Sequence, residues 1–400
     1  MCSHNHIGRR EYLEPTGLLL LTQTMISWAV YAPPVIAKQA LPEMGLDPIW
    51  IGAQPMIVFI SAMFVGVLAS SWVVSINPMR SSQLLICSCI IGVLLFSTGK
   101  IVLVVIGSAF VGAALGPSTP ASSHILARVT PAHLQPLIFS IRQASVALGG
   151  VLAGFVTPLL MQHWNWQISM LIIAISCLVT LCIVEIWVKN YKKYSEPNIE
   201  HRFDILKPIK LVLSIPSLRW LTVGMIPMVI AQYCLTTFIV LYLQDDIELS
   251  VITAGWILGT AQASGMFGRI LFGLIAGRYF TPLAVLTGLS ILAATASILT
   301  SILSGTWPIG LIFLIGIIFG ASAAGWNGIF LAEAARQSPS GQISRVTAGS
   351  TFFIFGGCVF GPAGFAIIIE KSSFSVAYIV SASLLLLSFY AFRMSSKNSN

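Results

Sequence analysis

Long apolar stretches separated by short polar segments run through the whole chain. Each stretch is close to the roughly 20 residues that a helix needs to cross a bilayer. They begin near Thr16, Ile49, Ser81, Ile101, Leu137, Gln167, Leu218, Val251, Leu283, Pro308, Thr347 and Phe374. We therefore predict an all-α membrane protein with twelve transmembrane helices. The first stretch, residues 16–38, is too long for the apolar part of a signal peptide, so we expect it to be retained.

The composition supports a membrane protein, because only 8% of the residues are charged, against roughly 25% in soluble domains. The net charge of +8 raises the question of nucleic acid as a partner. Threading the chain with both termini inside leaves every Lys and Arg on the inner side except Lys38, Lys100 and Lys371. That is the positive-inside bias. We expect a multi-pass protein of a bacterial inner membrane with both termini cytoplasmic, in contact with lipid and with no nucleic acid.

A long polar and basic interval at residues 189–217 divides the twelve helices into six and six. We expect an N-terminal bundle of residues 1–188, a cytoplasmic linker of residues 189–217 and a C-terminal bundle of residues 218–400. Shifting the second half back by about 207 residues lays Gly356-Gly357-Cys358-Val359-Phe360-Gly361 over Gly149-Gly150-Val151-Leu152-Ala153-Gly154. Six helices return the chain to its starting side, so the two halves are predicted to be parallel repeats.

The same shift aligns a short motif that follows the second helix of each half. It is Gly66-Val67-Leu68-Ala69 in the first half and Gly273-Leu274-Ile275-Ala276 in the second. With the repeat topology, it resembles the signature loop Gly-x-Leu-Ala-Asp-Arg of the major facilitator superfamily of secondary transporters. The resemblance implies two six-helix bundles around a central cavity, with alternating access by rocking of the bundles.

The motif of this chain differs from the family signature in one respect, since the Asp of the signature is missing in both halves. In the family this loop forms charge pairs at the inner side of the closed transporter. Arg80 and Arg278 therefore need other acidic partners here, with Glu185 and Glu333 as the candidates. Close helix approaches are expected at small-residue pairs such as Gly316 and Gly320.

The eighth apolar stretch carries an arginine. Gln262, Gly265, Arg269, Gly273 and Ala276 are spaced by three or four residues and so share one helix face. Arg269 lies nine residues before Arg278, or about 13 Å along a helix. At that depth an arginine costs about 2.5–3.5 kcal/mol, so it should face a cavity or a partner rather than lipid. A substrate site and a structural interhelical pair both remain open.

The order Arg-x-x-x-Gly-x-x-Ala at Arg269 resembles the eighth-helix arginine of monocarboxylate porters and oxalate/formate exchangers. In those families the corresponding residue meets the substrate carboxylate. The resemblance implies a small organic anion as the substrate, although Ile270 stands where those families often have Pro. Polar and aromatic residues of the first, seventh and tenth helices complete the expected cavity. The predicted substrate-binding residues are Arg269, Gln262, Gln232, Tyr233, Gln23, Trp28, Tyr31, Trp326 and Asn327.

A second group of residues is expected near the inner ends of the helices. Arg142 lies six residues after Pro136, close enough to inner water for a gate or an ion pair. Glu333 precedes Arg336 by three residues, a spacing typical of an ion pair on one helix, with a proton carrier as the alternative. The predicted gating and inner-loop residues are Arg142, Gly66, Arg80, Gly273, Arg278, Glu333 and Arg336.

Enzymatic motifs are missing from the sequence, which has no Gly-rich phosphate loop ending in Lys-Ser/Thr, no His-Glu-x-x-His and no Gly-x-Ser-x-Gly. We expect neither an enzyme nor a cofactor or metal. The predicted function is secondary transport of a small organic anion by a monomer. Symport and antiport stay open, with a proton as a candidate coupling ion. The alternatives are a drug or neutral-metabolite exporter of the same fold and a non-transporting membrane sensor.

Overall fold

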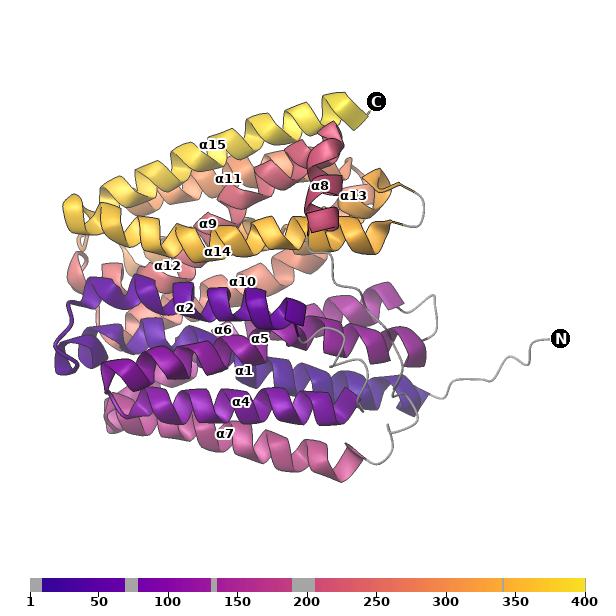
Figure 1. The fold of residues 1–400 in the computed structure, drawn as a ribbon. Helices are drawn as coiled ribbons and strands as arrows, with labels where there is room; N and C mark the ends of the chain where they lie inside the picture. The colour runs from indigo at the N-terminus through magenta and orange to yellow at the C-terminus, as the bar shows by residue number, and fades with distance from the viewer. Residues whose placement is uncertain (1–8, 69–77, 131–134, 189–205, 340–341, 400) are drawn as a thin grey trace. The chain divides into compact units, whose positions relative to one another are not determined.

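A computed structural model describes residues 9–68, 78–130, 135–188, 206–339 and 342–399, which are almost entirely helical (Figure 1). Their elements, in chain order, are α1 (Arg9–Glu43), the 3-10 helix η1 (Pro48–Gly52), α2 (Ala53–Leu68), α4 (Pro78–Ser97), α5 (Ile101–Val129), α6 (Gln135–His163), α7 (Trp166–Trp187), α8 (Leu206–Ser214), α9 (Pro216–Asp245), α10 (Val251–Arg278), α11 (Pro282–Ser301), α12 (Ile309–Ala324), α13 (Asn327–Gln337), α14 (Ile343–Lys371) and α15 (Phe374–Ser399).

The described residues contain ten helices that are long and apolar enough to cross a membrane. One of these spans, Ile309–Gln337, consists of α12 and α13 together. The shorter apolar helix Trp50–Gly66 overlaps α2, and α10, which is 28 residues long and carries the polar Gln262 and Arg269, is not one of these ten. With α2 and α10, these helices make the twelve that the sequence predicts, and the all-α fold is confirmed.

Contacts divide the chain into two compact units. Unit 1 contains Met1–Val30, Ile60–Gly149 and Trp164–His201, and unit 2 contains Tyr31–Phe59, Gly150–His163 and Arg202–Asn400. The division cuts through α1, α2 and α6 in addition to the polar interval between the sequence halves. The predicted bundle boundaries therefore stay a prediction. Of the predicted linker, residues 189–205 lie outside the described residues, and α8 occupies part of the remainder.

Unit 1 is built around an apolar cluster at the ends of several helices. Its members are Tyr12, Leu18, Leu19, Met79, Ile125, Leu126, Val129, Ile138, Val184 and Val188. At the other end, α4 and α5 are joined by a tight turn at Gly99, whose φ of +71° disfavours a residue with a side chain. The N-terminus of α7 is capped by Asn165, which accepts a hydrogen bond from the Ile168 backbone N–H at 2.9 Å.

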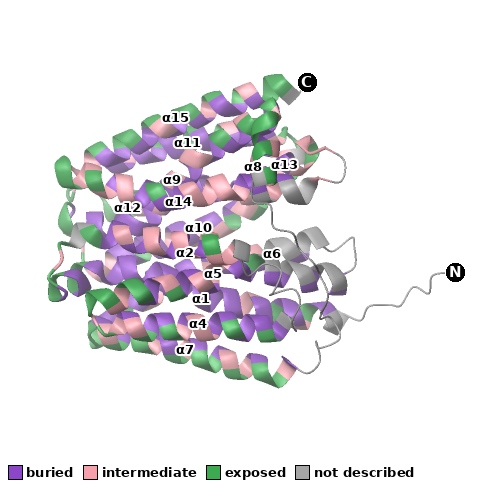
Figure 2. Cartoon of the chain, viewed as in Figure 1, coloured by how far each residue is buried: buried purple, intermediate pink, exposed green. Residues whose placement is uncertain are grey.

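Unit 2 is organised around α9, whose middle and end are almost continuously buried (Figure 2). The Tyr242 ring of α9 lies 5.2 Å from that of Phe374 and 5.5 Å from that of Tyr378. Buried polar groups bond across helices, as in the Tyr242 hydroxyl, which donates to the Thr300 carbonyl at 3.0 Å. Such interhelical hydrogen bonds add to van der Waals packing where water cannot compete.

Small residues form the closest helix contacts in both units, as predicted. A Cβ at Gly320 of α12 would overlap the backbone of Ala261 of α10, and one at Gly316 would lie 3.0 Å from Ile257. In unit 1, a Cβ at Gly116 would overlap the backbone of Ala62. These contacts bring neighbouring backbones close together, which fixes the positions of the side chains that flank them.

Candidate functional site

Arg269 lies on α10. Ser250 caps the N-terminus of this helix, since its side chain accepts a hydrogen bond from the Thr253 backbone N–H at 3.2 Å. Arg269 follows Gly265 by one turn, and a Cβ at Gly265 would lie 2.9 Å from the Cβ of Ala324. The partly buried guanidinium therefore reaches the end of α12, where its Nε donates to the Ala324 carbonyl at 3.1 Å. One edge of the guanidinium is thus fixed by a neutral backbone group.

Two tyrosines of unit 2 lie near this guanidinium. Both Tyr31 of α1 and Tyr233 of α9 interact electrostatically with Arg269. Their ring centroids are 6.5 Å apart, and Phe59 packs edge-on against Tyr233 with centroids 4.6 Å apart. Phenol groups are neutral near pH 7 and can both donate and accept hydrogen bonds. The structure thus brings together three residues from the predicted substrate set, with Phe59 packed against one of them.

The tenth transmembrane segment is interrupted beside this group. Gly325 and Trp326 separate α12 from α13, and the Asn327 side chain donates to the Ala324 carbonyl at 3.3 Å. Arg269 and Asn327 therefore share one acceptor. Interruptions of this kind expose backbone carbonyls, and transporters commonly use such carbonyls at their binding sites.

Gln232 and Trp326, both buried, form a polar pair in unit 2. The Trp326 Nε1–H donates to the Gln232 side-chain carbonyl at 3.1 Å. The pair joins α9 to the interruption between α12 and α13. Two further predicted substrate residues are thus in direct contact with each other.

Gln262, another member of the predicted set, packs at a different place. Its side chain lies where a Cβ at Gly150 of α6 would be. One turn further along, a Cβ at Gly154 would overlap the backbone of Gly259. Gln262 is therefore part of a tightly packed contact between α6 and α10.

Gln23 of unit 1 contacts a residue that was predicted to act as a gate. Its side-chain carbonyl accepts from Nη2 of Arg142 at 2.9 Å, and its amide donates to the Ser27 hydroxyl at 3.1 Å. Trp28 follows Ser27 and is buried. Arg142 itself is 2% exposed, so the expected reach of its side chain to inner water does not describe this structure.

The predicted partner of Arg80 is found in unit 1. Arg80 Nη1 and Glu185 Oε2 are 2.6 Å apart, and both side chains are 52% exposed. Gln83 joins this pair, since its amide donates to Glu185 at 2.6 Å. The ion pair ties the start of α4 to the end of α7, and Glu185 thus replaces the missing Asp of the signature loop as a partner for Arg80.

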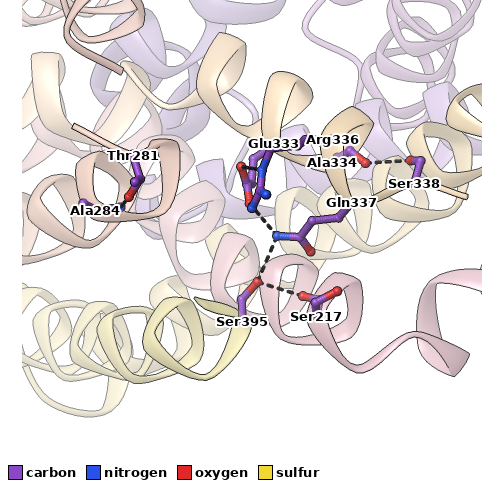
Figure 3. A network of polar contacts seen from close by, with 9 residues as sticks. All are labelled: Ser217, Thr281, Ala284, Glu333, Ala334, Arg336, Gln337, Ser338 and Ser395. Carbon is purple, nitrogen blue, oxygen red and sulfur yellow. Dashed lines mark hydrogen bonds and ion pairs between the residues drawn. The ribbon is translucent and has the colours of Figure 1, made fainter. Parts of the chain in front are cut away.

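Glu333 pairs with Arg336, as its spacing predicts. Nη2 of Arg336 lies 2.6 Å from Glu333 Oε1, and Gln337 donates to the same oxygen at 2.6 Å (Figure 3). Gln337 also donates to Ser395, whose hydroxyl donates to the Ser217 carbonyl. This chain of contacts links α13, α15 and the start of α9.

The remaining predicted inner-loop residues differ in their surroundings. A Cβ at Gly66 would lie 3.3 Å from the Gly116 backbone, whereas one at Gly273 would meet no atom within 4 Å. The Arg278 guanidinium lies 5.5 Å from the centroid of the Tyr279 ring. Only the first of the two aligned glycines therefore marks a close helix contact, which is a difference between the repeats that the sequence does not indicate.

Some residues of these groups were not predicted from the sequence. Phe59 and the Ala324 carbonyl contact the Arg269 group, and the Gln143 side chain accepts from Arg142. Gln143 follows Arg142 directly in the sequence, which could have indicated the contact. Nothing in the sequence indicates that Phe59 or the Ala324 carbonyl would lie at this group. Among the residues that the structure describes, no cluster of His, Cys, Asp or Glu could hold a metal ion.

These features define a multi-pass helical membrane protein with polar groups between its helices. Residues 16–346 match the family model of the Major Facilitator Superfamily. The chain therefore belongs to this family, and it is a secondary transporter and not an enzyme.

Solved structures with a similar fold are transporters. A bacterial homologue of the human lysosomal transporter Spinster, in an inward-facing and unoccupied conformation, has 16% identity and a TM-score of 0.76, with 98% of this chain and 99% of that chain covered. A POT family transporter in complex with a thioalcohol-conjugated peptide has 11% identity and a TM-score of 0.79, with 97% of each chain covered. At these identities the similarity establishes the fold.

Proposed function

We propose that this transporter carries a small organic anion and that Arg269 binds its carboxylate group. The observation that carries the proposal is the position of the guanidinium. Its Nε donates to the neutral Ala324 carbonyl, and the phenols of Tyr31 and Tyr233 lie near it. A carboxylate next to Arg269 would receive charge-assisted hydrogen bonds from the guanidinium. Tyr31 and Tyr233 can donate further hydrogen bonds to the same anion.

The geometry also favours arginine over lysine at this position. One nitrogen of the guanidinium holds the group against α12, and a guanidinium carries five N–H donors in a rigid, planar fork. An ammonium group is a point charge on a flexible stem and cannot reproduce a planar, bidentate contact. The proposal therefore predicts a loss of function even in a variant that keeps the positive charge.

The test is uptake by proteoliposomes that contain wild-type, Arg269→Lys or Arg269→Ala protein, with a panel of labelled small carboxylates. Arg269→Ala should reduce uptake at least about 100-fold, because the loss of two hydrogen bonds to a charged group costs about 3 kcal/mol. Arg269→Lys should also transport poorly. Phe267→Leu on the exposed side of the same helix is the matched control and should transport normally.

Uptake is normalised to monodisperse protein in detergent, which separates a binding role from a structural one. Loss of folded protein in both Arg269 variants would indicate a structural interhelical contact. Normal uptake by folded Arg269→Ala protein would refute the anion site. A neutral or cationic substrate would then be the better hypothesis, and the buried Gln232–Trp326 pair is the observation that favours it.

A further inference from the structure

Arg142 is a buried cation whose hydrogen bonds to the described residues of unit 1 are to neutral groups. It is 2% exposed. Nη1 donates to the Thr119 hydroxyl at 3.1 Å and to the Gln143 side chain, and Nη2 donates to Gln23 at 2.9 Å. Its Nε is buried and has no hydrogen-bond partner. The polar contacts thus satisfy part of the guanidinium and leave one donor unused.

A guanidinium stays protonated in proteins, and an unpaired buried charge costs several kcal/mol. Other arginines of this chain meet that requirement with a carboxylate, as Arg80 does with Glu185 and Arg336 with Glu333. In the described part of unit 1, Glu185 is already paired, and Glu14 is nine residues from Gln23 on α1, or about 13 Å along the helix axis. No described carboxylate forms an ion pair with Arg142.

The local packing explains how the cation comes to be buried. Arg142, Ser145 and Gly149 are spaced by three and four residues and share one face of α6. A Cβ at Gly149 would overlap Ser27 and would lie 2.7 Å from the Trp28 backbone N. The helices α1 and α6 therefore approach closely beside Arg142. Gln23, one turn before Ser27, is brought opposite the guanidinium by the same contact.

We propose that Arg142, together with Gln23 and Thr119, is an anion-binding site in which an oxyanion such as a carboxylate accepts from the unused Nε–H. The ligand is a separate small anion, and the three residues that would hold it all belong to unit 1.

The experiment is thermal unfolding of the purified, full-length protein in detergent, at constant ionic strength, with succinate, butyrate or chloride as the probe anion. A ligand that binds the folded state raises its apparent stability. Wild type should be stabilised, and Arg142→Gln should lose most of the anion-dependent shift in Tm. A loss with succinate and butyrate alone identifies a carboxylate site, a loss that includes chloride identifies a site for small anions in general, and an unchanged shift with all three probes refutes the site.

Gln23→Glu provides a test that does not remove the arginine. The new carboxylate stands where the Gln23 carbonyl already accepts at 2.9 Å, so it supplies the missing negative charge internally. This variant should have a higher Tm than wild type without added anion and should no longer respond at this site. Gln54→Glu is the matched control. Gln54 is also buried, at 7% exposed against 3% for Gln23, and its Oε1 has no hydrogen-bond partner, so a carboxylate there should lower the Tm.

An unchanged anion response in both folded Arg142→Gln and Gln23→Glu would overturn the site. Arg269→Ala in the same assay separates this proposal from the proposed function. If that variant keeps the full response and Arg142→Gln loses it, the Arg269 site fails and the Arg142 site stands. The opposite pattern leaves Arg269 as the anion site and refutes the one at Arg142.

Discussion

Glu185 and Glu333 both lie 2.6 Å from an arginine nitrogen, yet their surroundings are opposite. Glu185 and its partner Arg80 are each 52% exposed, whereas the Glu333 side chain has no exposed surface and its partner Arg336 is 57% exposed. Water can solvate both charges of the first pair after it separates. In the second pair, water can solvate only the arginine after the two charges separate. Equal distances therefore correspond to unequal energies, and the burial of the acid decides which contact the fold depends on.

The largest effect should come from the exposed member of the buried pair. Arg336→Ala removes the cation and leaves the Glu333 charge in the interior, which typically costs about 3 kcal/mol or more. Arg80→Ala leaves a half-exposed carboxylate, and such surface pairs contribute about 0–1 kcal/mol. We expect Arg336→Ala to lower the Tm of the purified protein clearly more than Arg80→Ala does.

A further variant examines the reason for this difference. Arg336→Ala combined with Glu333→Gln has no stranded charge, so it should recover part of the stability lost in Arg336→Ala alone. The comparison between the two acids would break down if Arg80→Ala and Arg336→Ala lowered the Tm equally, or if the double variant recovered nothing.

An intermediate effect is expected for Lys38, which joins the end of α1 to the end of α9 in unit 2. Its Nζ lies 2.5 Å from Asp245 Oδ1 and donates to the Gln244 carbonyl at 3.1 Å, and the two charged side chains are 42% and 34% exposed. We expect Lys38→Ala to cost about 1 kcal/mol. The cost should shrink in high salt, because salt screens exposed charges. Thermal unfolding of wild type and Lys38→Ala at low and high salt measures this cost. An equal cost at the two salt concentrations would show that the contribution of the pair is not electrostatic.

The smallest effect concerns Asp246, which follows the last residue of α9. Burial and the neighbouring Asp245 raise its pKa above the ordinary value of 3.8. The folded state therefore holds this proton more tightly than the unfolded state, so its stabilising contribution is present below pH 3.8 and is lost as the pH rises through the raised pKa. Asp246→Asn should be slightly more stable than wild type at pH 7, with the gain disappearing near pH 4. A constant difference from pH 4 to pH 7 would contradict this assignment.

The helices were predictable because their signal lies within single segments. Apolar length defines each span, and the three-residue spacing of Glu333 and Arg336 was enough to predict a pair on one helix. The close approach at Gly316 and Gly320 could be predicted for the same reason, since both residues lie on one face of α12.

Contacts between helices were harder to predict, because they depend on how far one helix is shifted along another. Gln23 and Arg142 are 119 residues apart, and Gln232 and Trp326 are 94 apart. Each residue was singled out as polar within an apolar stretch, but nothing in the sequence pairs them. The interruption at Gly325 and Trp326 also lies inside a continuous apolar stretch, so hydropathy alone does not show it.

The hydrogen bond between Arg269 and Ala324 sets a limit on motion. Its length is 3.1 Å, and such bonds weaken beyond about 3.2 Å, so the two groups can separate by only a few tenths of an ångström before the bond is lost. A displacement of the guanidinium therefore either draws the end of α12 with it or breaks this contact. Because only two residues separate the end of α12 from the start of α13, a movement of Arg269 in α10 is coupled to the helix that carries Glu333.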